Sequence, residues 1–423
     1  MRRRILNWRA ALGESARLAF DSVRSQPLRS LLAILGIVIG IVTVVMVASV
    51  LANVRNQIAL LFRELGTENV FAFHLTGDPY QPGSEDEARR KPLEPGFAEV
   101  LVRTGSSIRE VATQLIVPPL VNGRALIARA GDNESDTVLV EGVSPNFFDV
   151  AGAEFAAGRP FTELENRAGA EVAVIGAGVS RALFGGGRAV GRTLTLGGET
   201  FFVVGELAPR RGGFFGENRQ DRVLAVPIGT ASRRFTEAEN TVLYVRSKAG
   251  DLNRTRLETE AILRRLRRLG ADQPNDFTLS TSESIIRVFD EVSAQIGLVT
   301  VALAAVSLII GGIGIANVMI ISVTERTREI GLRMAVGARR REVLGQFLLE
   351  ASMLSTAGGA FGVAIALLLG GAVTLVIEGF SAIVPIWAVA AGLGAALSVG
   401  IVAGYLPARR AAALDPVEAL RYE

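Results

Sequence analysis

Hydrophobic residues gather in four long runs along the chain, separated by segments of mixed or charged composition. The runs cover Leu31–Asn53, Val292–Thr324, Ala351–Ile377 and Gly379–Ala408. Each exceeds the roughly 18 uncharged, mostly apolar residues that mark a membrane-crossing helix. At about 1.5 Å per residue, even the shortest run can cross a hydrocarbon core of about 30 Å. The pattern predicts a polytopic α-helical membrane protein, with four transmembrane helices at residues 28–53, 292–324, 343–377 and 379–406.

The segment 54–291, between the first two apolar runs, has a different pattern. Short runs of β-branched and aromatic residues predict strands at Asn69–Leu75, Val138–Val143, Glu171–Ile175, Thr193–Leu196, Phe201–Gly205, Arg222–Val226 and Thr241–Arg246. Apolar residues at helical spacing predict a helix that runs from Asp251, a residue suited to an N-cap, to about Leu269. A further helix is expected to begin near Ser282 and to continue into the second span. The pattern predicts a large α+β domain between transmembrane helices 1 and 2.

The remaining segments are shorter. Residues 1–27 repeat apolar positions at helical spacing, with arginines largely on the other side, which predicts an amphipathic helix at the membrane surface. Residues 78–95 and 209–218 are rich in Gly, Pro or charge and predict loops. The apolar part of the first run is longer than the core of a signal peptide, so we expect it to remain as a span. Residues 407–423 form a polar tail.

Arginine positions predict the orientation of the chain. Seven arginines fall in the first thirty residues, six in residues 324–342, and three in the tail. By the positive-inside rule, both termini and the segment 325–342 are cytoplasmic, and residues 54–291 are extracytoplasmic. The expected location is the bacterial cytoplasmic (inner) membrane. The pI of about 9.6 therefore reflects topology, and we expect no nucleic-acid partner.

The segment 325–342 is the one long charged connector between two membrane-length runs. Its composition favours a helix in which Arg328, Glu329 and Arg333 alternate with apolar residues. A break is expected at Gly337, before a run of three arginines. We interpret the segment as a helix presented to a cytoplasmic partner.

Most catalytic and cofactor chemistries are excluded by missing residues. The chain has no cysteine, one histidine (His74) and two lysines, neither of which follows a glycine-rich phosphate-binding loop. A zinc site, a Ser-His-Asp triad and a P-loop are therefore not expected, and neither is an enzyme activity. Glu350, near the start of the third span, either pairs with an arginine or has an intramembrane function.

Glycine pairs spaced four residues apart occur in three of the spans. Gly36 and Gly40, Gly358 and Gly362, and a third pair at 400 and 404 permit close helix approach. They predict helix packing within a compact bundle and a dimeric assembly.

Three blocks together resemble the permeases of MacB/FtsX-type ABC transporters. They are Leu28–Gly40 at the first span, Glu325–Ala338 in the charged connector, and Pro407–Tyr422 in the tail. A looser block, Gly142–Phe161, resembles the periplasmic core domain of that family. The resemblance implies one span, a large periplasmic domain and three further spans, in agreement with the topology predicted from hydropathy.

The resemblance also implies a coupling helix on which an ABC ATPase docks. The residues that it assigns to ATPase coupling are Thr327, Arg328, Glu329, Ile330, Gly331, Arg333, Met334, Gly337 and Ala338. We expect the charged members to hold the ATPase, and Ile330 and Met334 to fill a groove on it. ATP and magnesium are expected on a separate ATPase polypeptide, with no cofactor or metal on this chain.

The resemblance further implies a homodimer or heterodimer of permeases that moves periplasmic substrate by mechanotransmission, with a possible periplasmic adaptor and outer-membrane channel. It divides the outer domain into a membrane-proximal α/β part, 54–110 with 240–291, and a β-rich insertion, 111–239. Two alternatives stay open: an ATP-driven regulator of a cell-envelope hydrolase, and a lipoprotein-release permease. The size of the outer domain favours transport.

Overall fold

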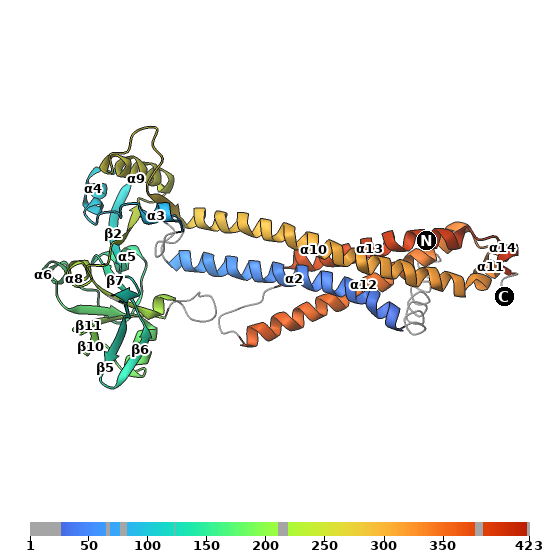
Figure 1. Ribbon diagram of the computed structural model, residues 1–423, viewed down its shortest axis with the longest axis horizontal. Helices are drawn as coiled ribbons and strands as arrows, with labels where there is room; N and C mark the ends of the chain where they lie inside the picture. Colours follow the sequence, from blue (N-terminus) through green and yellow to red (C-terminus); the bar gives the residue numbers. More distant parts are fainter. Residues whose placement is uncertain are drawn as a thin grey trace. The chain divides into compact units, whose positions relative to one another are not determined.

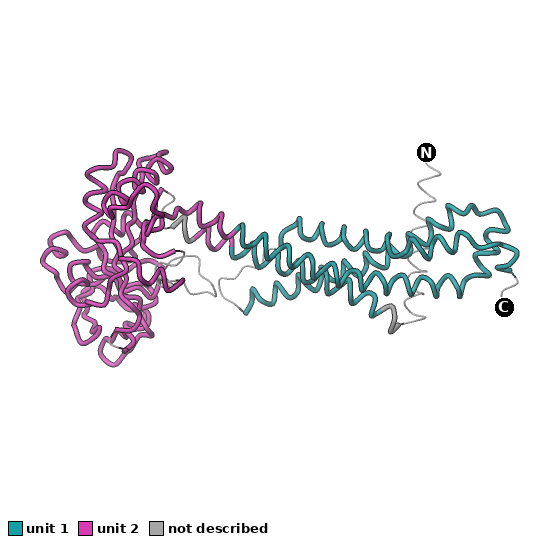
Figure 2. Tube along the Cα trace, turned by 45° about the horizontal axis from the view of Figure 1, so that its top comes forward, with its two compact units in different colours: residues 1–54, 290–423 teal, residues 55–289 magenta. Residues whose placement is uncertain are grey.

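The computed structural model describes residues 27–64, 68–76, 83–121, 123–209, 219–376 and 384–420. The amphipathic helix predicted at residues 1–27 lies outside the described residues, apart from Pro27, as does nearly all of the loop predicted at 209–218. The chain divides into two compact units, residues 1–54 with 290–423 and residues 55–289 (Figure 2). We call the first the membrane unit and the second the outer unit.

Four helices in the described residues are long and apolar enough to cross a membrane (Figure 1). They are α2 (Pro27–Glu64), α10 (Ser282–Glu325), α12 (Arg340–Val376) and α13 (Ile386–Ala412). This confirms the fold class predicted from hydropathy. The start of α10 at Ser282 also confirms that one helix continues from the outer domain into the second span. Two short helices, α11 (Thr327–Ala335) and α14 (Pro416–Leu420), complete the membrane unit.

Small residues bring these helices together. A β-carbon on Gly36 would lie 2.9 Å from the backbone of Gly311 in α10, and one on Gly40 would lie 3.2 Å from the Ala304 carbonyl oxygen. The other two predicted pairs also lie against a neighbouring helix. Gly358 and Gly362 face α2, at Ile34, Ile37, Val38 and Ile41. Gly400 and Gly404 face α12, at Ala351, Ser352 and Ser355. All three pairs therefore pack helices within one chain. Their predicted role in a dimer stays a prediction.

The outer unit is built on one mixed sheet, in the order β14-β1-β13-β2-β7-β12-β9-β11-β10-β5-β6, with β8 paired to β11. The strands are β1 (Asn69–Phe73), β2 (Ile108–Ile116), β5 (Ile127–Ala130), β6 (Asn133–Thr137), β7 (Leu139–Val143), β8 (Phe155–Gly158), β9 (Val172–Ile175), β10 (Thr193–Leu196), β11 (Glu199–Leu207), β12 (Val223–Pro227), β13 (Asn240–Ser247) and β14 (Thr278–Thr281). A separate hairpin pairs β3 (Leu120–Val121) with β4 (Arg124–Ala125). The pairs β7–β12 and β9–β11 are parallel, and the other strand pairs are antiparallel.

Short helices cover this sheet. They are α3 (Glu85–Ala88), α4 (Phe97–Thr104), α5 (Phe147–Val150), α6 (Glu163–Ala168), α7 (Ala177–Phe184), α8 (Ile228–Arg234), α9 (Leu252–Leu266) and the 3₁₀ turn η2 (Arg219–Arg222). Within the outer unit, α4 and α9 lie at one end, and β5, β10 and β11 lie at the other (Figure 1). The sheet order brings the first and last strands of the unit together, because β1 pairs with both β13 and β14.

The predicted strands all coincide with observed ones, and β10 matches residue for residue. The strand β2 was not predicted, and the division that we drew between residues 110 and 111 falls inside it. The helix α9 follows Asp251, as predicted, but the Asp251 side chain makes no capping hydrogen bond. Its buried residues include Ile262 and Leu263 from the predicted apolar positions. The predicted loop at 78–95 contains α3 in its described part.

Alternation along β1 places side chains on both faces of the sheet. Val70 and Ala72 join the core beneath α4 and α9, whereas Phe71 and Phe73 join an aromatic core on the opposite face. Since both faces are covered, every residue of β1 is buried. The aromatic core includes edge-to-face contacts such as Phe148 with Phe161, whose ring centroids lie 5.3 Å apart.

Two surface carboxylates tie separate elements of the outer unit together. Glu258 on α9 accepts hydrogen bonds from the Ser107 backbone N–H (2.9 Å) and from the hydroxyls of Ser106 and Ser107. These bonds, led by that of the Ser106 hydroxyl, lower the pKa of Glu258 from 4.5 to about 2. Glu165 on α6 accepts two bonds from the Arg159 guanidinium, at 2.9 and 2.8 Å, and caps its own helix. These contacts, led by those of Arg159, lower the pKa of Glu165 to about 2.

Candidate functional site

The charged connector folds as the short helix α11, separated from α10 by a break at Arg326. Arg326 has φ −103° and ψ 15°, outside the helical range, so the chain turns there. The Thr327 hydroxyl donates to the carbonyl oxygens of Val323 (3.0 Å) and Thr324 (2.9 Å). Two carbonyls that lose helical partners at the end of α10 are thereby satisfied.

The far end of α11 is closed by Gly337, as the sequence predicts. Gly337 has φ +108°, a conformation that a side chain would strain. The Ala338 N–H donates to the Arg333 carbonyl (3.0 Å), and the Gly337 N–H donates to the Met334 carbonyl (3.1 Å). This pair of bonds is a Schellman motif, which ends α11 and reverses the chain toward α12.

One face of α11 packs on the membrane unit itself. Thr327, Ile330 and Gly331 are buried, and Met334 is half-buried. Ile330 is 4% exposed and belongs to the core formed by α2, α10, α12 and α13. A β-carbon on Gly331 would lie 2.6 Å from the β-carbon of Ala419 in α14, so the α11 backbone packs directly against the Ala419 methyl group.

The opposite face of α11 is exposed. It carries Arg328 and Glu329 together with Leu332 (56% exposed) and Val336 (83% exposed). This corrects our expectation for Ile330, whose side chain is occupied in this chain's own core and cannot enter a partner's groove. The apolar residues available to a partner are Leu332 and Val336, which the sequence interpretation did not single out. The sequence predicts a helix that ends at Gly337, but which face of that helix turns inward depends on its packing against α14.

Polar contacts fix α11 and the start of α12. Arg333 forms an ion pair with Glu329 and donates to the Gln346 side chain at 3.0 Å. Glu350, 3% exposed, lies 3.5 Å from the Arg326 guanidinium. The structure thus supports the structural interpretation of Glu350 as the partner of an arginine. Of the other predicted residues, Gly337 is exposed and Ala338 is half-buried.

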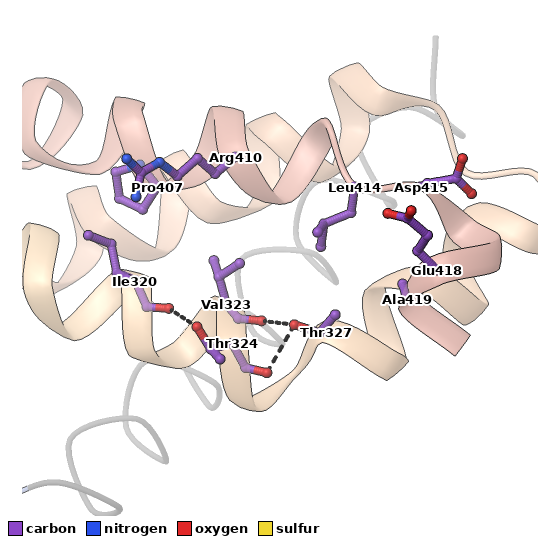
Figure 3. Close-up of a pocket in the computed structure, with 10 residues that line it drawn as sticks. All are labelled: Ile320, Val323, Thr324, Thr327, Pro407, Arg410, Leu414, Asp415, Glu418 and Ala419. Atoms are coloured by element: carbon purple, nitrogen blue, oxygen red, sulfur yellow. Dashed lines mark hydrogen bonds between the residues drawn. The ribbon is translucent and has the colours of Figure 1, made fainter. Parts of the chain in front are cut away.

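A cavity of about 300 Å³ lies beside α11, between the ends of α10, α13 and α14 (Figure 3). Its lining is Ile320, Val323, Thr324, Thr327, Pro407, Arg410, Leu414, Asp415, Glu418 and Ala419. Two of its hydroxyls, on Thr324 and Thr327, donate to backbone carbonyls of α10, at Ile320 and Val323. The lining mixes apolar surface with one cation and two carboxylates.

The outer unit contains a buried histidine, His74, which is 4% exposed. Burial and the nearby Arg267 and Arg90 guanidiniums lower its pKa. Among the described residues, no group of three or more His, Cys, Asp or Glu side chains could hold a metal ion. The candidate functional site is therefore α11, which has one buried face and one exposed face.

Comparison with known families gives two matches. A model described as "MacB-like periplasmic core domain" matches residues 30–259, more than half of the chain, and one described as "FtsX-like permease C-terminal" matches residues 301–416. The chain belongs to the MacB-like permease family. The resemblance inferred from the Leu28–Gly40 and Glu325–Ala338 blocks is thereby confirmed.

Curated relatives of this family align with nearly the whole chain. The pyoverdine export ATP-binding/permease protein PvdT of Pseudomonas aeruginosa is 34% identical over 419 residues, which cover 98% of this chain and 59% of that protein. The macrolide export ATP-binding/permease protein MacB of Bradyrhizobium diazoefficiens is 34% identical over 413 residues, 97% of this chain and 60% of that protein. The chain therefore spans about three-fifths of the length of these relatives.

Among solved structures, the periplasmic region of MacB from Actinobacillus actinomycetemcomitans matches with a TM-score of 0.43 and 19% identity. That match covers 54% of this chain and 95% of the solved one.

Proposed function

We propose that this chain is the permease subunit of a MacB-type ABC transporter of the bacterial inner membrane. In this proposal, ATP hydrolysis by an ABC ATPase subunit drives a conformational change of the outer domain and exports a periplasmic substrate by mechanotransmission. Two copies of the permease pair with two ATPase subunits, and both termini and α11 are cytoplasmic. A periplasmic adaptor and an outer-membrane channel complete the path.

The observation that supports this proposal is the division of α11 into two faces. Its inner face, through Ile330 and Gly331, is fixed to the transmembrane core and to α14. Its outer face presents Arg328 and Glu329 beside Leu332 and Val336. Apolar anchors rimmed by charges are typical of a docking surface. A partner that moves this face therefore moves α10 and α12 with it.

The continuity of α10 supports the transmission step. This helix has 44 residues, more than twice the roughly 20 that a membrane span needs. It begins directly after β14, which pairs with β1 in the outer sheet. A displacement at its α11 end is passed along one hydrogen-bonded rod. The relatives' names, pyoverdine export and macrolide export, favour export over control of a cell-wall hydrolase.

The test is replacement of the exposed anchors. Leu332→Asp and Val336→Asp should each weaken binding of the ABC ATPase subunit that co-purifies with the full chain by about tenfold or more, because each puts a charge into an apolar contact. ATP hydrolysis by the complex should lose its dependence on the permease. The matched control is Val102→Asp on α4 of the outer unit, where Val102 is 44% exposed. Unchanged ATPase binding in both α11 variants would contradict the proposal.

The orientation has its own test, because the chain contains no cysteine. A Val336→Cys variant should resist a membrane-impermeant thiol reagent in intact cells and react once the membrane is opened. Labelling in intact cells would place α11 on the outer side and remove the ATPase from contact.

A further inference from the structure

A second cavity lies on the same pair of helices as the cavity of Figure 3. It has a volume of about 380 Å³ and runs between α10 and α13. Its lining is wholly apolar apart from the Ser398 hydroxyl: Leu308, Ile309, Gly312, Ile313, Ala316, Ser398, Val399, Val402 and Ala403. Small residues create the space, and the Ser398 hydroxyl donates to the Gly394 carbonyl of its own helix (2.8 Å). Nothing polar in this groove is left for a polar ligand.

The two cavities follow one seam. On α10 the groove is lined by residues 308, 312 and 316, and the cavity beside α11 by residues 320 and 324. Positions four apart in a helix lie on one face, so this set forms a single stripe. On α13 the same progression runs from 399 and 403 in the groove to 407 and 410 in the cavity. The apolar groove between α10 and α13 therefore leads to the charged cavity of Figure 3, near the end of α13. We call this cavity the mouth of the groove.

The charges of the mouth are ordered along the seam. In Figure 3 the Arg410 guanidinium overlaps the Pro407 ring at one end of the cavity. Pro407 is the cavity residue of α13 that is nearest in sequence to the groove residues. The carboxylates of Asp415 and Glu418 lie at the other end, toward α14. Arg410 and Glu418 are exposed and have no ion-pair partner among the residues that the structure describes. An occupant would meet apolar surface first, then a cation, then two carboxylates.

We propose that this seam binds one phospholipid whose head group carries a phosphate and a primary ammonium, that is, phosphatidylethanolamine. An acyl chain fills the groove between α10 and α13. The phosphate accepts charge-assisted hydrogen bonds from Arg410, and the ammonium donates to Glu418 and Asp415. The order of charges in the mouth matches the order in this lipid, from glycerol outward.

Charge and hydrogen bonding separate this lipid from its competitors. A phosphatidylglycerol head group has the phosphate but no cation, so it would bring an anion beside two carboxylates. The quaternary ammonium of phosphatidylcholine carries its charge without N–H donors for those carboxylates. A transmembrane helix of a second copy would fill the apolar groove but would leave the three charges of the mouth unmatched.

The experiment is native mass spectrometry of the full chain, delipidated in detergent and titrated with phosphatidylethanolamine, phosphatidylglycerol or phosphatidylcholine of the same acyl chains. Phosphatidylethanolamine should be retained about tenfold more strongly than the other two, as expected for one extra set of charged hydrogen bonds. Glu418→Gln should abolish that preference, because it removes a partner of the ammonium. Arg410→Gln should instead weaken retention of all three lipids about tenfold, because all three carry the phosphate. Arg409→Gln is the matched control, because Arg409 is exposed on the same turn but lies outside the cavity lining.

A second pair of variants tests the groove without touching the charges. Ser398→Phe, at an exposed position of the groove, should reduce retention of phosphatidylethanolamine about tenfold by filling the space of the acyl chain. Leu397→Phe, at a neighbouring exposed position outside the groove, should leave it unchanged.

Three results would overturn the proposal. One is equal retention of the three lipids by the unaltered chain, and another is retention that none of the variants changes. The third is efficient crosslinking between two copies through a Val402→Cys substitution, which would show that a second copy covers the groove. None of these results bears on ATPase binding at Leu332 and Val336, so the two proposals fail separately.

Discussion

The outer unit and the membrane unit are packed by opposite kinds of residue. The outer unit is filled by large side chains, such as Phe71, Phe148 and Phe161, which meet edge to face between sheet and helices. In the membrane unit, the helices pack most closely at glycines, where the lack of a side chain lets a neighbouring helix approach. Examples are Gly36 against Gly311 and Gly404 against Ala351. In water, burial of apolar surface drives association, so large residues stabilise most. In lipid that driving force is missing between helices, and close backbone contact replaces it.

This difference predicts that the two units respond in opposite ways to substitutions that change side-chain size. The outer unit should be damaged by removing atoms and the membrane unit by adding them. Each experiment below asks whether a change in one unit has the effect that its packing predicts.

The largest effect is expected in the aromatic core. Phe161→Ala should lower the free energy of unfolding of the outer unit by about 3–5 kcal/mol, because Phe161 is 2% exposed and its loss leaves a cavity. Urea titration of the full chain, followed by hydrogen exchange of the β7 and β12 amides, measures this. Phe202→Ala on β11 removes the same ring from a position that is 46% exposed, and it should cost less than about 1 kcal/mol. Equal losses in the two variants would show that burial does not govern this core.

A smaller effect of the opposite kind is expected in the membrane unit. Gly36→Ala should cost about 1–3 kcal/mol, because the added methyl group meets the Gly311 backbone, which cannot move aside easily. Gly394→Ala is the matched change, since a β-carbon there meets nothing within 4 Å. It should be neutral or stabilise α13 by up to about 1 kcal/mol through helix propensity. Thermal denaturation in detergent compares them, and a shared downward shift would contradict close packing at Gly36.

The smallest effect concerns acid. Glu165 and Glu258 have a pKa of about 2 in the folded outer unit and 4.5 when unfolded, so their contribution to stability is fully present above pH 4.5. It is lost as the pH falls from 4.5 toward 2, since protonation then favours the unfolded chain. Both groups are near the surface, where water screens their interactions and keeps the effect modest. The protection factors of the α6 and α9 amides, that is, their exchange rates relative to the intrinsic rates at each pH, should fall over this pH range.

Substitution separates these two carboxylates from general acid unfolding. Glu165→Gln should flatten the acid response at α6, and Glu258→Gln should flatten it at α9. Glu94→Gln, at an exposed position, should leave both responses as they are. If all three variants keep the original pH profile, the two hydrogen-bond networks do not couple to folding.

The sequence is most informative where one physical pattern dominates. Long apolar runs locate the four spans, because nothing else in a protein requires so many uncharged residues together. The strand β10 is also readable, since Thr193–Leu196 is short, β-rich and bounded by a glycine turn. By contrast, β2 has the charged residues Arg109 and Glu110 near its start, and charged residues are not expected in a central strand. The sequence pattern therefore does not predict this strand. Glu110 is tolerated there because it pairs with Arg246 of β13 at 2.9 Å.

The candidate site shows a second reason for incomplete prediction. The sequence predicts a helix within residues 325–342 and a break at Gly337, and both follow from local chemistry; the structure places this helix at Thr327–Ala335. Which face of that helix turns inward depends on Ala419, from the far end of the chain. The composition of α11 alone offers Ile330 and Leu332 as equivalent apolar residues, although only Ile330 is buried. Long-range packing decides between them.

The close contact between Gly331 and the Ala419 methyl group has a practical consequence for inhibitor design. A synthetic peptide that copies α11 would lack the neighbour against which this helix is held, and in isolation nine residues are too few to remain helical in water. Such a mimic would need an added brace, for example a covalent staple on the Ile330 side, before it could compete for whatever binds Leu332 and Val336.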